Sequence, residues 1–144
     1  RDRIYARVTA DRARAEARAA AERARLGLRR SLFDGVPLSW KDLFDSAGVA
    51  TESGSALLAG RVPEADALVL RNATAAGAVC LGKTHMSELA FSGLGLNPVT
   101  ATPPNPHDPA WVPGGSSSGA AASTAARCVG TSCSPSCCSR ARAR

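Results

Sequence analysis

Two short apolar runs separated by a helical stretch are the feature that most constrains the fold of this chain. Residues 36–40 are predicted to form a short buried strand that begins at Pro37, where a strand tolerates proline. Residues 64–76 have a helical pattern that Gly77 ends, and residues 78–81 form the second apolar run. A strand, a crossover helix and a second strand predict an α/β fold, with a parallel sheet and helices on its faces.

Helices are also predicted on either side of this unit. Residues 3–26 are rich in alanine and carry charges at helical spacing, so we expect one helix that stops at Gly27. Thr84 is placed to cap a short helix, and another helix is expected from about Ser117. The intervening residues 93–115 are rich in Gly, Pro and Asn, which predicts a long surface loop. Loops of this length are uncommon unless they are functional.

The charge is distributed unevenly along the chain. The formal net charge is +6, yet residues 31–126 contain eight acidic and only four basic residues. The basic excess lies at the two ends, whereas a nucleic-acid surface needs basic residues gathered on one folded face. No nucleic-acid partner is therefore predicted. We assign an N-terminal helix to residues 1–30, an α/β domain to residues 31–127 and an atypical tail to residues 128–144.

Other classes of protein are disfavoured by composition. No apolar run approaches the roughly 20 residues that a membrane span needs, so we expect a cytoplasmic protein without membrane contact. The five cysteines lack paired C-x-x-C spacing and have no neighbouring histidine, so no metal site is predicted. The chain begins with Arg1 instead of methionine, which indicates a fragment.

Residues 77–84 match the P-loop pattern G-x-x-x-x-G-K-[ST] letter for letter. A P-loop must be a loop between a strand and a helix, so that its amides surround a phosphate. Here the residues between the two glycines are themselves the predicted strand, and a helix precedes them. A nucleotide-binding module that uses Lys83 is therefore kept only as an alternative of another class.

A glycine- and serine-rich stretch, residues 113–119, directly precedes the last predicted helix. Paired glycines allow unusual backbone angles, and a helix N-terminus that gathers hydroxyl and amide groups favours negative charge. Such a site suits a developing oxyanion. The same letters also describe a flexible linker. Far upstream, Lys41 ends an apolar strand, and the two features together suggest parts of a hydrolytic site.

Several segments, in this order and spacing, closely resemble the amidase signature family. They are Gly35–Asp42, Ala76–Val79, Gly82–Glu88, Asn105–Pro106 and Pro113–Gly119. The resemblance covers residues 35–126 well and the N-terminal helix loosely. It implies the N-terminal part of a fold with a mixed, largely parallel sheet between helix layers. It also implies an enzyme that hydrolyses small-molecule amides without a cofactor, with a homodimer possible for the full-length family.

The resemblance also implies a catalytic Ser–cisSer–Lys triad. Lys41 matches the catalytic lysine and Ser116 the serine held by a cis peptide bond, while Ser117 lies in a supporting position. Lys41 would have to act in its neutral form, which requires a pKa well below the usual value of about 10.4. The apolar strand next to Lys41 is consistent with such a pKa.

The tail departs from the family pattern. The nucleophilic serine is expected near Arg140, at the end of a Gly-Thr-Asp-x-Gly-Gly-Ser segment. Ser139 lies close to that position, but its neighbours include no paired glycines, so no nucleophile is identified. The polypeptide is therefore predicted to be inactive. The Cys/Ser/Arg bias of residues 128–144 suggests an out-of-frame or truncated gene.

Within the family, two subclasses share these motifs. One contains stand-alone amidases, and the other the glutaminase-type A subunit of a tRNA-dependent amidotransferase. The segment of residues 85–92 looks more like the stand-alone amidases, which we therefore favour.

Overall fold

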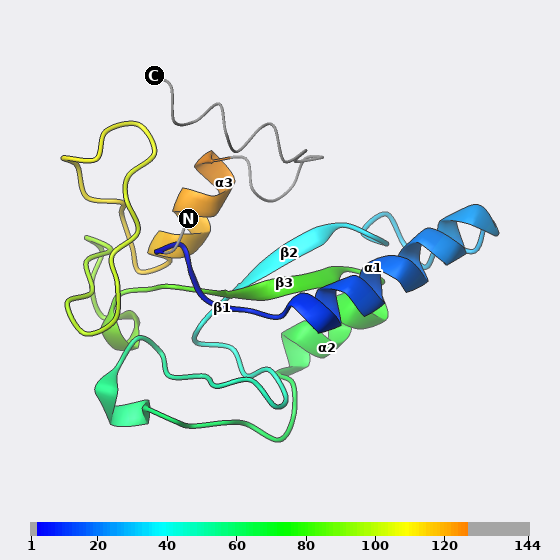
Figure 1. Cartoon of the computed structure of the whole chain (residues 1–144), viewed down its shortest axis with the longest axis horizontal. Coiled ribbons are helices and arrows are strands. Elements are labelled where there is room, and N and C mark those ends of the chain that lie inside the picture. The colour runs from blue at the N-terminus through cyan, green and yellow to red at the C-terminus, as the bar shows by residue number, and fades with distance from the viewer. Residues whose placement is uncertain (1–2, 127–144) are drawn as a thin grey trace.

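A small mixed sheet lies at the centre of residues 3–126, the part of the chain that the computed structural model describes (Figure 1). The predicted tail, residues 128–144, lies outside these residues. The elements in chain order are β1 (Tyr5–Val8), α1 (Ala10–Arg25), β2 (Pro37–Lys41), the 3₁₀ turn η1 (Ala56–Leu58), α2 (Leu68–Ala75), β3 (Val79–Thr84), the 3₁₀ turn η2 (Glu88–Ala90) and α3 (Ser118–Ala125).

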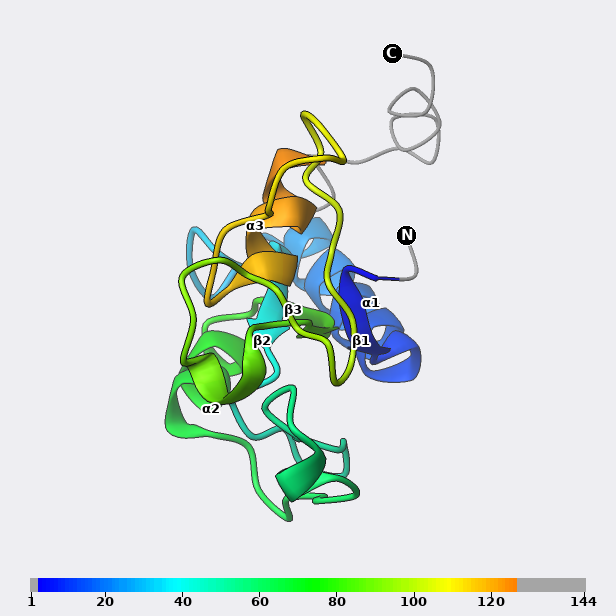
Figure 2. The same ribbon diagram turned by 90° about the vertical axis from the view of Figure 1, so that its left-hand side faces the viewer.

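The strand order is β1-β3-β2, with β3 in the middle. β2 runs parallel to β3 and is joined to it through α2, whereas β1 pairs with β3 in the antiparallel direction. In both ribbon views α3 lies on one side of the strands and α2 on the other (Figures 1 and 2). The predicted α/β class and the strand–helix–strand unit are therefore confirmed. β2 is half-buried instead of buried, because it is an edge strand of the described sheet.

The single helix predicted for residues 3–26 is wrong at its beginning. Residues 5–8 form β1, and the helix starts only at Ala10. Tyr5 and Val8 are residue types that favour strands, and the free edge of β3 supplies hydrogen-bond partners for them. The Thr9 amide still donates to the Leu81 carbonyl oxygen, which holds the chain in the sheet up to the start of the helix.

The helix predicted for residues 64–76 begins later, at Leu68. Asp66 does not lie in a first turn, because its carboxylate accepts the Ala47 amide and pairs with Arg12 of α1. The Ala67 amide donates to the Asp45 carbonyl oxygen and keeps this residue extended. Tertiary contacts thus replaced the first turn that the sequence pattern indicated.

The cap predicted at Thr84 is also wrong. Thr84 is the last residue of β3, where it is paired with both Tyr5 and Lys41. The regular structure that follows directly is the short turn η2, and its Leu89 and Ala90 have positive φ values that end any helix. The helix predicted from about Ser117 is confirmed as α3, which begins one residue later.

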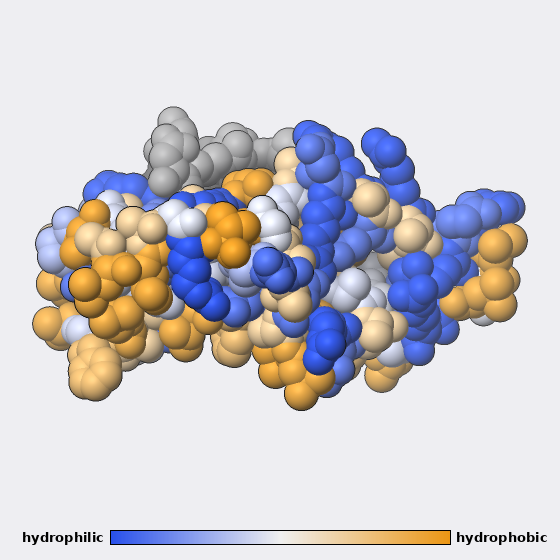
Figure 3. Space-filling model, turned by 90° about the horizontal axis from the view of Figure 1, so that it is seen from below, coloured by the Kyte–Doolittle hydropathy of each residue, from blue (hydrophilic) through white to orange (hydrophobic). Residues whose placement is uncertain are grey.

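Large apolar side chains are exposed on the loop-rich part of the chain. Figure 3 shows orange, apolar side chains gathered at one end of the face seen from below. In the segment of residues 89–112 the exposed large apolar residues are Leu89, Phe91, Leu94, Leu96, Val99, Trp111 and Val112. Contiguous exposed apolar surface of this kind is typical of a face that contacts another surface.

We expect Gly119→Ala to destabilise the protein by about 1–3 kcal/mol, the usual cost of overpacking. α3 packs directly on the chain that follows β3, and the Gly119 amide donates to the His85 carbonyl oxygen. A Cβ at position 119 would lie 2.5 Å from the Ile4 carbonyl oxygen and 2.8 Å from the His85 amide nitrogen. Urea unfolding of the chain measures the loss. Gly93→Ala is the control, because its Cβ would meet nothing within 4 Å; equal losses in the two variants would contradict this account.

A second prediction concerns Asp34, whose side chain is fully buried and accepts two hydrogen bonds from Arg23 and one from the Arg30 amide. These donors hold the pKa of Asp34 far below its usual range. The contribution to stability is therefore complete above the unfolded-state pKa of about 3.9 and is lost as the pH falls toward the folded-state value. In urea unfolding between pH 7 and pH 3, we expect Asp34→Asn to lower the midpoint at pH 7 and to flatten the loss on acidification.

The control for this pH series is Asp11→Asn, since Asp11 pairs with Arg14 in full exposure to solvent. It should leave both the midpoint and the slope close to those of the unmodified chain. An Asp34→Asn chain with the unmodified pH slope would contradict the assignment.

Candidate active site

The structure brings together the lysine and the serine that the sequence singled out. Lys41 Nζ donates a hydrogen bond of 2.6 Å to Ser116 Oγ, although the two residues lie 75 positions apart. Lys41 is the last residue of β2, and Ser116 lies just before α3, which packs against β2 and β3. The sheet and the helix thus determine the distance between these two groups.

The environment of Lys41 favours its neutral form. The side chain is half-buried, and burial lowers the pKa of its ammonium group. α3, the helix next to the site, contains no charged residue in the sequence SGAAASTA. Burial thus moves Lys41 toward the neutral form, the form that a lysine needs in order to accept a proton.

Backbone hydrogen bonds to other segments hold Ser116 in place. The Gly115–Ser116 peptide bond is cis, the form that the resemblance attached to this serine. The Ser116 carbonyl oxygen accepts the Ser87 amide, and the Gly115 amide donates to the Gly93 carbonyl oxygen. These contacts fasten the glycine–serine stretch to the residues after β3, so it is an ordered part of the site and not a flexible linker.

A surface hollow of about 360 Å³ opens beside Ser116. It is lined by Ala90, Phe91, Ser92, Gly93 and Ser116. The sequence placed residues 85–92 among the family motifs but gave them no part in a site. Their place follows from the turn at η2, where positive φ values redirect the chain toward the serine stretch.

Ser117, predicted to support the site, is the residue that precedes α3. Its carbonyl oxygen accepts the Ala121 amide, and its side chain makes no capping hydrogen bond within the described residues. Ser139, the serine closest to the expected nucleophile position, lies outside those residues. Lys41 and Ser116 are therefore the two groups that the structure joins.

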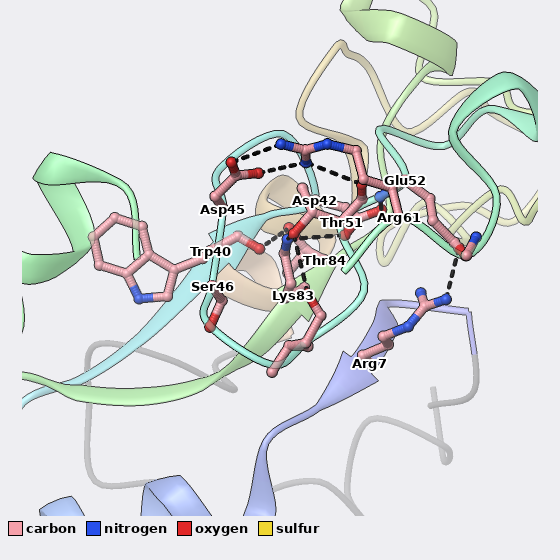
Figure 4. Close-up of polar contacts among 12 residues, drawn as sticks. Arg7, Trp40, Asp42, Asp45, Ser46, Thr51, Glu52, Arg61, Lys83 and Thr84 are labelled. Carbon is pink, nitrogen blue, oxygen red and sulfur yellow. Dashed lines mark hydrogen bonds and ion pairs between the residues drawn. The ribbon is translucent and has the colours of Figure 1, made fainter. Parts of the chain in front are cut away.

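Lys83 is not a phosphate-binding lysine. Gly82, Lys83 and Thr84 belong to β3, and the Lys83 side chain is fully buried. Its Nζ donates to Thr51 Oγ1 and lies 3.2 Å from a carboxylate oxygen of Asp42 (Figure 4). The nucleotide-binding alternative is therefore wrong, because it needs this amine free to reach a bound phosphate. Sequence reasoning missed the Lys83–Asp42 pair, although a lysine at the end of an apolar strand was a signal for it.

Within residues 3–126, no three His, Cys, Asp or Glu side chains are grouped so as to hold a metal ion. None of the helices in the same range is long and apolar enough to cross a membrane.

The described residues thus combine an α/β sheet with a hydrogen-bonded lysine–serine pair next to the N-terminus of α3, which defines a candidate polar active site. The chain belongs to the amidase (amidase signature) family, whose model, described as Amidase, matches residues 2–133. The resemblance seen in the sequence is therefore confirmed.

Three known proteins illustrate the similarity. The A subunit of the glutamyl-tRNA(Gln) amidotransferase of Anaeromyxobacter sp. (strain K) is 50% identical over 119 residues, which cover 83% of this chain and 24% of the relative. The peptide amidase of Stenotrophomonas maltophilia is 37% identical with a TM-score of 0.76, over 85% of this chain and 26% of that one. An inhibitor-bound structure of a vestigial protein complex, connected with the origins of an s-triazine catabolic enzyme, is 38% identical with a TM-score of 0.82, over 87% and 28% of the two chains. The chain thus spans about a quarter of the length of the relatives that it matches.

Proposed function

We propose that residues 3–126 supply the lysine and the relaying serine of an enzyme that hydrolyses carboxylic amides. The observation that carries this proposal is the hydrogen bond from Lys41 Nζ to Ser116 Oγ, within a chain of the amidase family. Half-burial of Lys41 and the hollow beside Ser116 support it.

In the proposed reaction, neutral Lys41 withdraws a proton from Ser116, which takes one from a nucleophilic serine. That serine attacks the amide carbonyl carbon. The same relay then returns the proton to the leaving nitrogen, so that an amine or ammonia departs and an acyl-enzyme remains. Water, activated through the same pair, attacks the ester and releases the acid. In this mechanism Lys41 and Ser116 move protons but form no bond to the substrate.

The nucleophile of this reaction is not identified in the sequence. We therefore expect that the 144-residue chain neither releases ammonia from amides nor reacts covalently with a serine-directed fluorophosphonate. Intact-mass spectrometry after incubation with the reagent measures the reaction. An adduct on any serine of the chain would contradict the expectation that the chain contains no reactive nucleophile.

The proposed roles are tested in a hybrid enzyme, in which residues 3–126 replace the matching segment of the Stenotrophomonas maltophilia peptide amidase. The hybrid enzyme should hydrolyse peptide amides. A hybrid that unfolds cooperatively on heating yet has no activity would contradict the proposal, and so would one whose activity survives the loss of Lys41 and Ser116.

A second candidate is a glutaminase-type A subunit, which the 50% identity to the Anaeromyxobacter protein favours. The discriminating measurement uses a second hybrid built on that protein. If this candidate is right, the second hybrid releases ammonia from glutamine at a rate comparable to its parent, whereas the peptide amidase hybrid hydrolyses peptide amides measurably but much more slowly than its own parent. The stand-alone amidase predicts the reverse.

A further inference from the structure

A second lysine, the fully buried Lys83, lies on β3 beside β2, and the side chains of Lys41 and Lys83 point to opposite faces of the sheet. In the parallel register of β2 and β3, Trp40 is level with Lys83 and Lys41 with Thr84. Side chains alternate between faces along a strand. Lys41 therefore points to the face of Ser116, whereas Asp42, next in sequence, points to the face of Lys83.

Asp42 is firmly held on that face. Its side chain is 3% exposed, and one carboxylate oxygen lies 3.2 Å from Lys83 Nζ. The other oxygen accepts the Glu52 amide at 3.2 Å. Its amide donates to the Thr84 carbonyl oxygen, and its carbonyl oxygen accepts the Ser53 amide. Figure 4 shows Lys83, Asp42 and Thr51 meeting where β2 ends and the next loop begins.

We propose that Lys83 is a positioning residue for Lys41: by pairing with Asp42, it neutralises the carboxylate adjacent in sequence to Lys41 and fixes the end of β2. This inference rests on the proposed role of Lys41 as the base. Without a cation beside it, the Asp42 carboxylate would stabilise the ammonium form of its neighbour and oppose the effect of burial.

The other charges near this place are already balanced. From the loop after β2, Asp45 pairs with Arg61 and Glu52 with Arg7 of β1. α3 contributes no charge. His85, after β3, has its pKa lowered by burial, which favours its neutral form. The Lys83–Asp42 pair is buried and contains the carboxylate next in sequence to Lys41. Disrupting this pair therefore leaves an uncompensated charge directly beside Lys41 in the sequence.

The test needs no enzymatic activity, because the chain contains only two lysines, Lys41 and Lys83. The full chain is labelled with trace acetic anhydride between pH 7 and pH 11, and each lysine peptide is quantified by mass spectrometry. In the unmodified chain, Lys83 should be protected relative to the chain in urea, and the labelling midpoint of Lys41 should lie below that of a free lysine. Equal labelling of Lys83 in both conditions would overturn the arrangement.

The Lys83→Met substitution should raise the labelling midpoint of Lys41, because it leaves the buried Asp42 carboxylate without its cation. The double substitution Asp42→Asn with Lys83→Met removes both charges and should return the midpoint to the unmodified value. Arg61→Met is the control, because it removes a pair from the same region that is much more exposed, and it should cause no shift.

A role in packing alone predicts that the single and double variants behave alike, and that result would overturn the proposal. If Lys83→Met does not fold, Asp42→Asn alone carries the test. It removes the carboxylate and leaves Lys83, so the midpoint of Lys41 must stay or fall, and a rise would overturn the proposal. Failure of the hybrid enzyme to hydrolyse amides would contradict the catalytic role of Lys41 without changing these midpoints.

Discussion

In the hybrid enzyme, Lys41→Met lowers kcat/KM for amide hydrolysis by about 10⁴–10⁶-fold, the loss typical of removing the base from a serine hydrolase triad. Methionine preserves much of the length and apolar stem of lysine, so β2 keeps its packing while the proton acceptor is lost. Ammonia release from a peptide amide measures the change.

The pH dependence of kcat/KM provides a second test of the role of Lys41. Because burial lowers the pKa of Lys41, its neutral form becomes available below the pH at which free lysine loses its proton. The kcat/KM of the unmodified hybrid should therefore fall as the pH decreases through that lowered pKa. The residual activity of the Lys41→Met hybrid should not fall in this way as the pH decreases. Arg61→Met, a similar change in an exposed pair, should keep both the value of kcat/KM and its fall at low pH. A Lys41→Met enzyme with an unchanged pH dependence of kcat/KM would rule out Lys41 as the base.

Ser116→Ala is expected to lower kcat/KM of the hybrid enzyme by about 10²–10⁴-fold, the contribution typical of a positioned proton-transfer group. The substitution removes the oxygen that accepts the hydrogen bond from Lys41, and it leaves the Ser116 carbonyl oxygen free to accept the Ser87 amide as before. Steady-state kinetics on the same peptide amide measure the loss.

Two further variants test whether Ser116 acts together with Lys41. If both belong to one relay, the double variant Lys41→Met with Ser116→Ala should be no slower than Lys41→Met alone. The loss of Lys41 already stops proton transfer through the relay, so removing Ser116 as well has no further effect. Ser123→Ala is the matched control, since Ser123 is a buried serine of α3 whose hydroxyl donates to the Ala120 carbonyl oxygen. A multiplicative loss in the double variant would contradict a shared relay.

The stand-alone amidase and the glutaminase-type A subunit remain separate proposals for this site. The motifs that contain Lys41 and the glycine–serine stretch are shared by the two subclasses, so these motifs do not distinguish between them. The hollow beside Ser116 is lined by residues 90–93, which places Phe91 next to the proposed site.

The sequence by itself determined the local pattern of the fold. An apolar run, a helix and a second apolar run dictated a parallel pair of strands, because a short crossover through one helix brings the second strand back beside the first in the same direction. The start of α3 after the serine stretch was predicted to within one residue. Lys41 and Ser116 were singled out through the resemblance of their motifs to the amidase signature family.

Tertiary structure alone decided what depends on partners distant in sequence. Residues 5–8 became a strand because the edge of β3 was open to them, and Leu68 became the start of α2 because Asp66 and Ala67 were already bound elsewhere. The burial of Lys83 required β2, β3 and the loop at Thr51 to meet. Hydrogen bonds and charge neutralisation across such distances have no local signal, so the sequence indicated which residues to expect in a site, and only the fold showed what each of them contacts.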